Sequence, residues 1–176
     1  MAGDIGAARA ATAAVTAGDH RAFMGAFPTG VSVITSLDAD GRPHGLTCTS
    51  LASVSLRPPT LLVCLGERSG TLAALRGHGA FAVNLLHLHG RATAELFASP
   101  DPRRFSLTPW RPAPGTGTPW LTTAAFATAE CEVTGIVPAG DHALVLGRVR
   151  SLDRRPGLPL LYGLRGFSAW PGPPAL

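Results

Sequence analysis

Turn signals divide most of this chain into runs no longer than a β-strand, and this spacing is what most constrains the fold. Residues 31–37 alternate valine and isoleucine with small polar residues, as a half-buried strand does. An Asp-Ala-Asp-Gly turn signal follows, and residues 43–49 are the expected return strand. A Pro-Pro pair separates two further runs, 51–56 and 60–65. Many short strands joined by turns favour a mainly β, antiparallel barrel over a parallel βαβ sheet.

The remaining segments predict a few helices and the strands that complete the barrel. Asp19 is a candidate cap for a short helix that carries Phe23, Met24 and Phe27 on one side. Ser69 is a candidate cap for a second helix, and residues 91–98 predict a third. Further strands are expected at 81–86, 124–137 and 143–152, with 160–170 closing the sheet and 111–119 as a surface loop.

These elements predict a single domain. We expect a flexible N-terminal arm over residues 1–18, the domain over 19–170 and a Pro-rich tail over 171–176. No apolar run approaches the roughly 18–20 residues of a membrane helix. The first residues also lack the basic segment, apolar stretch and cleavage site of a signal peptide. We therefore expect a cytoplasmic protein without a membrane partner.

The formal net charge of +4 comes from basic residues that are scattered along the chain. All 15 of them are arginine, so Schiff-base chemistry and a Walker-A phosphate loop, which need lysine, are excluded. Nucleic-acid binding usually shows a clustered basic stripe, whereas the longest basic runs here are pairs. We therefore expect no nucleic-acid partner.

The cysteines and histidines do not form a convincing metal-binding pattern. Cys48, Cys64 and Cys131 lie far apart in apolar runs, so buried reduced thiols are the simplest interpretation. His87 and His89 would face the same side of a strand. No third ligand near them has suitable spacing, so we expect no metal site.

Small hydroxyl side chains gather between two predicted strands, at Thr47-Cys48-Thr49-Ser50 and again at Ser53 and Ser55. Such a stretch lets a flat ligand lie against exposed backbone N–H groups while hydroxyls reach its polar edge. The alternative is a Thr/Ser-rich strand whose hydroxyls face water.

The tripeptide Ser69-Gly70-Thr71 stands at a predicted helix start. Free N–H groups, the positive helix end and two hydroxyls would together hold a phosphate. The alternative is ordinary capping of the helix by Ser69.

A turn with the sequence Gly140-Asp141-His142 joins two long predicted strands. A histidine on a loop of a rigid barrel is well placed for binding or for handling a proton. The alternative is a solvent-exposed imidazole in an Asp-containing turn.

In their order, several segments resemble one family across residues 21–170. The segments are 23–36 (FMGAFPTGVSVITS), 45–63 (GLTCTSLASVSLRPPTLLV), 69–75, 81–86 (FAVNLL), 130–133 (ECEV), 140–146 (GDHALVL) and 159–167 (PLLYGLRGF). They are similar to the flavin reductase family with the FMN-binding split-barrel fold. Its members are typically the reductase components of two-component flavin monooxygenases.

The resemblance implies a homodimeric, Greek-key antiparallel split barrel that binds FMN or FAD. NADH or NADPH would donate hydride, and the reduced flavin would pass by diffusion to a separate monooxygenase. Two alternatives are a flavoprotein of the same fold that keeps its flavin as an electron-transfer cofactor and a non-catalytic flavin-binding protein.

The resemblance also implies roles for particular residues. Along or beside the isoalloxazine ring would lie Thr47, Cys48, Thr49, Ser50, Leu51, Ala52, Ser53 and Ser55. Ser69, Gly70 and Thr71 would hold the ribityl phosphate, without help from an arginine. His142 would be the catalytic residue beside the nicotinamide, Tyr162 would close that side, and Arg165 would meet a phosphate of the nicotinamide cofactor. The family often has an aromatic residue where this chain has Leu51 and another where it has Gly163.

Overall fold

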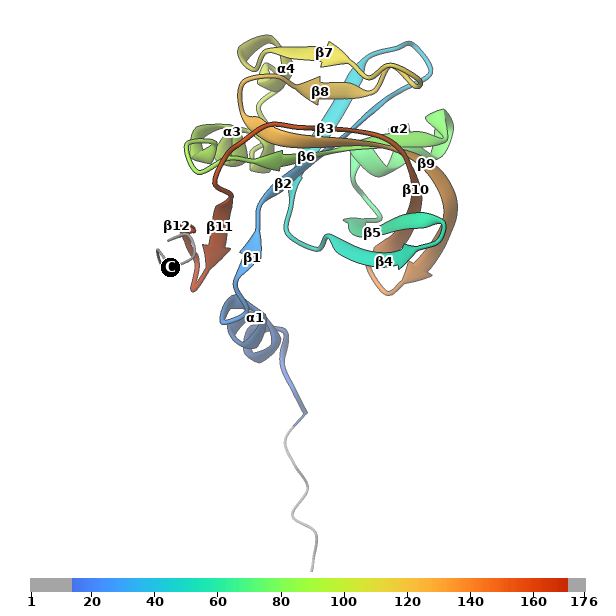
Figure 1. Cartoon of the computed structure of the whole chain (residues 1–176). Coiled ribbons are helices and arrows are strands. Elements are labelled where there is room, and N and C mark those ends of the chain that lie inside the picture. Colours follow the sequence, from blue (N-terminus) through green and yellow to red (C-terminus); the bar gives the residue numbers. More distant parts are fainter. Residues whose placement is uncertain (1–13, 171–176) are drawn as a thin grey trace, which may run out of the picture.

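The computed structural model describes residues 14–170, and a seven-stranded antiparallel sheet forms its body (Figure 1). The strands stand in the order β3-β2-β6-β9-β10-β5-β4. They are β2 Ser32–Leu37, β3 Pro43–Cys48, β4 Ala52–Leu56, β5 Pro59–Gly66, β6 Ala80–Leu86, β9 Ala125–Ala139 and β10 His142–Arg154. The sheet curls so that buried residues of β2, β3, β5, β6, β9 and β10 share one interior. The expected mainly β, antiparallel barrel is therefore confirmed.

The two edge strands of the sheet, β3 and β4, leave a seam in the barrel, and the Ser50 side chain bridges this seam near the end of β3. Residues 49–51 connect β3 to β4, which are neighbours in the chain but not in the ladder order. The Ser50 hydroxyl accepts a hydrogen bond from Cys64 N of β5 at 3.1 Å and donates one to Cys64 O at 3.0 Å. The backbone of residues 49–51 thus stays outside the strands of the sheet.

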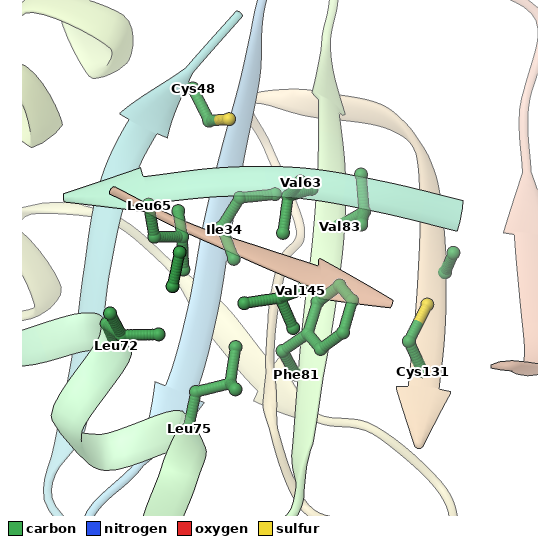
Figure 2. Packing of buried hydrophobic residues seen from close by; sticks show 12 residues of the cluster. Ile34, Cys48, Val63, Leu65, Leu72, Leu75, Phe81, Val83, Cys131 and Val145 are labelled. Carbon is green, nitrogen blue, oxygen red and sulfur yellow. The ribbon is translucent and has the colours of Figure 1, made fainter. Parts of the chain in front are cut away.

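Apolar side chains from the strands and from α2 (Gly70–His78) fill the barrel. Figure 2 shows Leu72 and Leu75 entering the interior from α2, in the cluster that includes Phe81 of β6. Phe81 packs against Gly147 of β10, where a Cβ would collide with the ring. Burial of each large apolar side chain contributes roughly 1.5–3 kcal/mol, so this cluster makes the barrel a rigid support for its rim.

The segment expected to close the sheet forms a separate small sheet instead. Strands β11 (Leu160–Gly163) and β12 (Gly166–Ala169) make a hairpin that pairs with β1 (Thr29–Gly30) in the order β1-β11-β12. The expectation was wrong because β11 finds its partner in β1, just before β2 enters the barrel, with Val31 N donating to Leu160 O at 3.0 Å.

Helix α1 (Ala17–Gly25) lies at the far end of this small sheet, away from the barrel body (Figure 1). Its N-cap is Thr16 rather than Asp19. The Thr16 hydroxyl accepts from Asp19 N at 3.1 Å, and the Asp19 carboxylate accepts from Thr16 N at 3.0 Å. Asp19 therefore completes a capping box from inside the helix, which begins three residues earlier than a cap at Asp19 would imply. Phe23, Met24 and Phe27 are all exposed in the single chain.

The predicted surface loop 111–119 is in part a hairpin of β7 (Trp110–Pro112) and β8 (Pro119–Leu121). The buried Asn84 side chain holds β8 against the barrel, because its Oδ1 accepts from Leu121 N at 2.7 Å. The loop-like sequence of residues 111–119 did not predict that the buried Asn84 side chain would hold this segment. Two further helices are α3 (Arg91–Ala98), as expected, and the short α4 (Arg104–Leu107).

Residues 1–13 of the expected arm and the expected tail 171–176 lie outside the described residues. Within residues 14–170, no helix is both long and apolar enough to cross a membrane.

Candidate functional site

Four cavities adjoin one another along β3 and the connection that follows it. The β3 cavity (about 390 Å³) lies between residues 46–50, residues 64–66 and His142. The α2 cavity (about 370 Å³) lies at the start of α2. The α1 cavity (about 790 Å³) lies between residues 49–52, α1 and the β11–β12 turn. The α3 cavity (about 370 Å³) lies between β3, α3 and the aromatic residues of β11 and β12.

Thr49 connects these cavities, since it lines the β3, α1 and α3 cavities at once. Other hydroxyls of the predicted stretch are already engaged. Thr47 donates to Ala94 O at 2.6 Å, and Ser50 bridges to Cys64. The hydroxyl of Thr49 makes no hydrogen bond within the described residues, so it remains available to a ligand.

The structure brings together most of the predicted hydroxyl-rich stretch, but not its last two members. Residues 47–52 line one or more of the cavities. Ser53 and Ser55 lie on β4 and line none of these four cavities, and Ser55 Oγ accepts from Arg57 N at 3.1 Å. Leu51 and Ala52 face the α1 cavity.

The cysteines near the site are free thiols, as is Cys131. Cys48 is buried, as expected, whereas Cys64 is only partly buried. Burial raises the pKa of the Cys48 thiol, so Cys48 stays neutral beside the Ser50 hydroxyl at 3.1 Å.

His142 is the first residue of β10 and lies on the rim of the β3 cavity. Its Nδ1 is 2.7 Å from Oδ1 of Asp141. The hydrogen bond to His142 holds the pKa of the Asp141 carboxyl below its usual value. With Nδ1 engaged, Nε2 is the ring atom that lies near Gly66, where a Cβ would be 4.0 Å away. The Asp141 carboxylate thus contacts the His142 ring and fixes its orientation, a pairing that the turn sequence alone did not predict.

The α2 cavity combines helix N–H groups with an unused hydroxyl. Ser69 caps α2, since its Oγ accepts from Thr71 N at 3.2 Å, so the capping alternative is correct for this side chain. Thr71 is only 4% exposed, lines the cavity and makes no side-chain hydrogen bond to any described residue. The Thr71 hydroxyl is reachable from the cavity, so it can donate to a ligand or accept from one.

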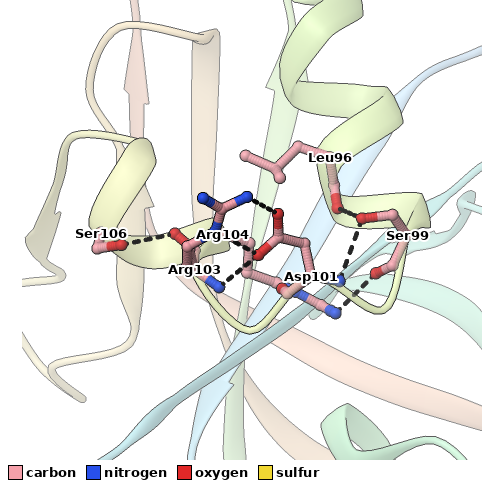
Figure 3. Close-up of polar contacts among 6 residues, drawn as sticks. All are labelled: Leu96, Ser99, Asp101, Arg103, Arg104 and Ser106. Atoms are coloured by element: carbon pink, nitrogen blue, oxygen red, sulfur yellow. Dashed lines mark hydrogen bonds and ion pairs between the residues drawn. The ribbon is translucent and has the colours of Figure 1, made fainter.

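An arginine that the sequence did not single out also lines the α2 cavity. Figure 3 shows Arg103 paired with Asp101, while Arg104 turns toward backbone groups. The Arg104 guanidinium donates to Gly45 O and Ser99 O at 2.7 Å each and to Asp101 O at 3.0 Å. These bonds use three of the five N–H groups of a guanidinium, and within residues 14–170 Arg104 forms no ion pair with a carboxylate.

The presence of Arg104 corrects the expectation that no arginine stands beside Ser69-Gly70-Thr71. The sequence shows only the pair Arg103-Arg104. Which of the two would reach the cavity depends on the turn of α4, which the sequence pattern did not predict.

The α1 cavity contains Tyr162 and Arg165 of the C-terminal hairpin. The two-residue turn of this hairpin places Leu164 and Arg165 in the left-handed region, with φ of 50° and 61°. Such a conformation costs an L-residue roughly 1–2 kcal/mol. Leu164 is 83% exposed, whereas Arg165 lines the cavity. A Cβ at Gly163 would lie 3.2 Å from Pro28, which leaves little room for an aromatic side chain there.

Tyr162 also lines the α3 cavity, where its ring meets Phe167 edge to face at 5.1 Å between centroids. Tyr162 therefore stands between the α1 and α3 cavities, and Thr49 lines both on the barrel side.

His87 and His89 follow β6, so the expectation that they lie on a strand was wrong, although their rings meet edge to face at 5.8 Å between centroids. His87 Nε2 bonds Thr123 O at 2.7 Å, and its Nδ1 accepts from His89 N at 3.0 Å. Both ring nitrogens of His87 are thus used in hydrogen bonds to the backbone that stabilise the turn. No group of three potential metal ligands occurs in the part of the chain that the structure describes.

Comparisons with known proteins show the family of the chain. Residues 24–171 match the family model described as "Flavin reductase like domain". A flavin reductase (NADPH) of Lentzea aerocolonigenes is 55% identical over 89% of this chain and 91% of its own length. A flavin reductase (NADH) of Kitasatospora aureofaciens is 44% identical over 85% of this chain and 79% of its own length.

A solved structure of a monooxygenase component is also similar to this chain. Nitrilotriacetate monooxygenase component B of Mycobacterium thermoresistibile superimposes with a TM-score of 0.81 and 32% identity, covering 89% of each chain. The family match, the two relatives and this barrel agree, and the chain belongs to the flavin reductase-like family.

Proposed function

We propose that the protein is an NAD(P)H-dependent flavin reductase that transfers hydride from NADH or NADPH to FMN or FAD. Reduced flavin would then pass by diffusion to a separate flavin-dependent monooxygenase. The names of the relatives support the reaction, and the name of the structural neighbour supports the monooxygenase partner. The observation that carries the proposal is the series of cavities with shared lining residues that runs from the start of α2, along residues 46–52, to His142 and Tyr162.

The β3 cavity and its neighbours fit a flat tricyclic ring. Backbone groups of residues 49–51 are outside the sheet ladder, and the Thr49 hydroxyl is available. We place the ring against Thr49, Ser50, Leu51 and Ala52, with Thr47 and Cys48 beside it. Because the Ser50 hydroxyl is engaged with Cys64 and the Thr47 hydroxyl with Ala94 of α3, contacts from Ser50 and Thr47 would come from the backbone. Ser53 and Ser55 would support this stretch from β4.

The α2 cavity fits the phosphate of the flavin. The backbone N–H group of Gly70, the Thr71 hydroxyl and the positive end of α2 would bind the phosphate, while Ser69 holds the helix start by accepting from Thr71 N. Arg104 adds a charge whose position is set by backbone carbonyls, so little reorganisation is needed to bind an anion.

When bound, the flavin supplies the two-electron chemistry, and the protein has to bind and orient the reactants. Hydride transfer needs the two reacting rings at roughly 3–3.5 Å in a stacked arrangement. Asp141 orients the His142 ring so that Nε2 faces the cavity, where His142 would position the nicotinamide. Tyr162 would close the same side, and Arg165 would meet a phosphate of the nicotinamide cofactor.

A homodimer is part of the proposal, and one face of the barrel supports it. Directly paired residues share a face, which places Cys64, Val137 and Leu144 together, and Leu62 with Leu146. All five are at least partly exposed in the single chain. Covering such an apolar face with its copy would remove it from water. Light scattering of the purified protein tests this, and a monomer at micromolar concentration would contradict it.

The reductase proposal is tested by mixing the protein with NADH or NADPH and an excess of FMN, FAD or riboflavin. Loss of the nicotinamide absorbance band should continue for many turnovers per protein molecule. One turnover per protein, with flavin retained through dialysis, would favour an electron-transfer flavoprotein. Flavin binding without turnover would favour a non-catalytic binding protein. We also propose a cytoplasmic location, since free cysteines suit a reducing compartment.

A further inference from the structure

The α1 cavity holds two arginines that binding of the flavin does not require. We propose that Arg21 and Arg165 bind the 2′-phosphate of NADPH, so that the protein uses NADPH in preference to NADH. This inference rests on the proposed reductase function, because it concerns the electron donor of that reaction.

The charge of the α1 cavity is the first support. Arg21 enters from α1 and Arg165 from the hairpin turn, and no Asp or Glu is among the residues that line the cavity. Neither guanidinium forms an ion pair or a hydrogen bond with another residue in the range 14–170. By contrast, Arg111 pairs with Asp153 at 3.0 Å on the barrel surface. Two like charges that face one cavity repel each other, so the cavity favours an anion.

The backbone of the turn is the second support. Arg165 occupies a left-handed position that glycine or asparagine would adopt with less strain. The same turn exposes Leu164 to solvent and presents Arg165 to the cavity. The fold therefore keeps an arginine where the backbone disfavours one, as strained residues at binding sites do.

The chemistry of the two nicotinamide cofactors selects the ligand. In Rossmann-fold dinucleotide sites a carboxylate binds the ribose 2′-hydroxyl of NADH, whereas an arginine accommodates the 2′-phosphate of NADPH, and this charge complementarity does not depend on the fold. The planar guanidinium matches phosphate oxygens in a two-point contact. The α1 cavity lacks the carboxylate, has the arginines and adjoins the proposed ring site through Thr49 and Ser50. The flavin phosphate has its own arginine, Arg104, in the α2 cavity.

Calorimetry without flavin tests the site directly, with adenosine 2′,5′-bisphosphate and 5′-AMP as probes. The wild-type protein should bind the bisphosphate about tenfold more tightly than 5′-AMP, or better. Arg21→Gln and Arg165→Asn should each reduce this difference to less than about threefold. Asparagine suits the left-handed position, so the turn is kept. Arg154→Gln is the matched control, because Arg154 is exposed and lines none of the cavities described.

Steady-state kinetics with saturating FMN gives the second measurement. The ratio of kcat/KM for NADPH to that for NADH should exceed one in the wild type and fall about tenfold or more in either variant. Equal losses with both donors, equal binding of the two probes, or a wild-type preference for NADH would overturn the proposal. If neither donor is oxidised while the bisphosphate still binds more tightly, the reductase function fails and the arginine site stands.

Discussion

The Nδ1 atom of His142 lies 2.7 Å from Oδ1 of Asp141, so the orientation of the imidazole is set by the residue directly before it. Both side chains are on the rim of the barrel, with the Asp141 carboxylate almost fully in solvent. The pair therefore positions a ring atom without burying a charge. This arrangement suits a reaction in which the protein aligns two rings and handles little charge itself.

His142→Ala should lower kcat/KM for the nicotinamide donor by roughly ten- to a hundredfold, because misplacement of the reacting ring is costly. The Kd for FMN should change by less than about threefold. Asp141→Asn should lower the same kcat/KM by only about two- to fivefold, the range of an exposed ion pair. Stopped-flow reduction of bound FMN separates rate from affinity. If flavin binding collapses in His142→Ala and the rate per bound flavin stays normal, the assigned role is wrong.

Arg104→Gln should weaken FMN binding by about tenfold or more, because a hydrogen bond to a charged group contributes roughly 1.5–3 kcal/mol. Thr71→Val keeps the shape of the side chain and removes the hydroxyl, so it should weaken FMN by roughly two- to tenfold. Riboflavin, which lacks the phosphate, should bind both variants nearly as well as it binds the wild type.

Arg103→Gln is the matched control for Arg104→Gln, because Arg103 pairs with Asp101 and lines none of the cavities described. Fluorescence titration of each flavin measures the effect. Equal weakening of FMN binding and riboflavin binding in Arg104→Gln or Thr71→Val would show that the α2 cavity does not bind the flavin phosphate.

Glu130 makes stability depend on pH. Burial alone would raise its pKa, but hydrogen bonds from the Ser151 hydroxyl and the N–H groups of Gly115 and Thr116 outweigh burial and lower it. A carboxyl whose pKa is lower in the folded state stabilises the fold above its unfolded pKa of about 4.3. This stabilisation is lost as the pH falls through the folded pKa.

Urea unfolding between pH 7 and pH 3 checks this prediction. The free energy of unfolding of the wild type should fall across the acidic end, and Glu130→Gln should show a smaller fall. At pH 7, Glu130→Gln should be less stable by roughly 1–3 kcal/mol, since it weakens hydrogen bonds to a charged acceptor. Parallel pH profiles for the two proteins would show that Glu130 is not a source of the pH dependence.

The strand pattern was sufficient to predict the barrel, because alternation and turn signals are local. Residues 31–37 and 60–65 became β2 and β5 within two residues of the expected ends. Pairing between distant segments was less predictable. The β11–β12 hairpin looks like another strand of the barrel, and only its pairing with β1 places it beside α1.

The candidate site shows the same division between local and distant information. Residues 69–71 and His142 do line cavities. Their placement could be predicted because a helix start and a turn are visible in the sequence. The use of the Ser50 hydroxyl by Cys64 of β5 could not be seen, since it joins strands across the seam. Arg104 was missed for a related reason. Its partners are backbone carbonyls, which no side-chain pattern reveals.

Leu164→Asn should stabilise the protein. Leu164 has a φ of 50° and is 83% exposed, so its side chain contributes little packing while its backbone is disfavoured. Asparagine enters the left-handed region more readily, which should raise the free energy of unfolding by up to about 1 kcal/mol. Leu164→Ala is the control, because alanine removes the same apolar surface and keeps the backbone penalty. A thermal melt should place Leu164→Asn above the wild type and Leu164→Ala at or below it. If alanine stabilises as much as asparagine, the gain comes from removing exposed leucine, and the turn that carries Arg165 is not strained.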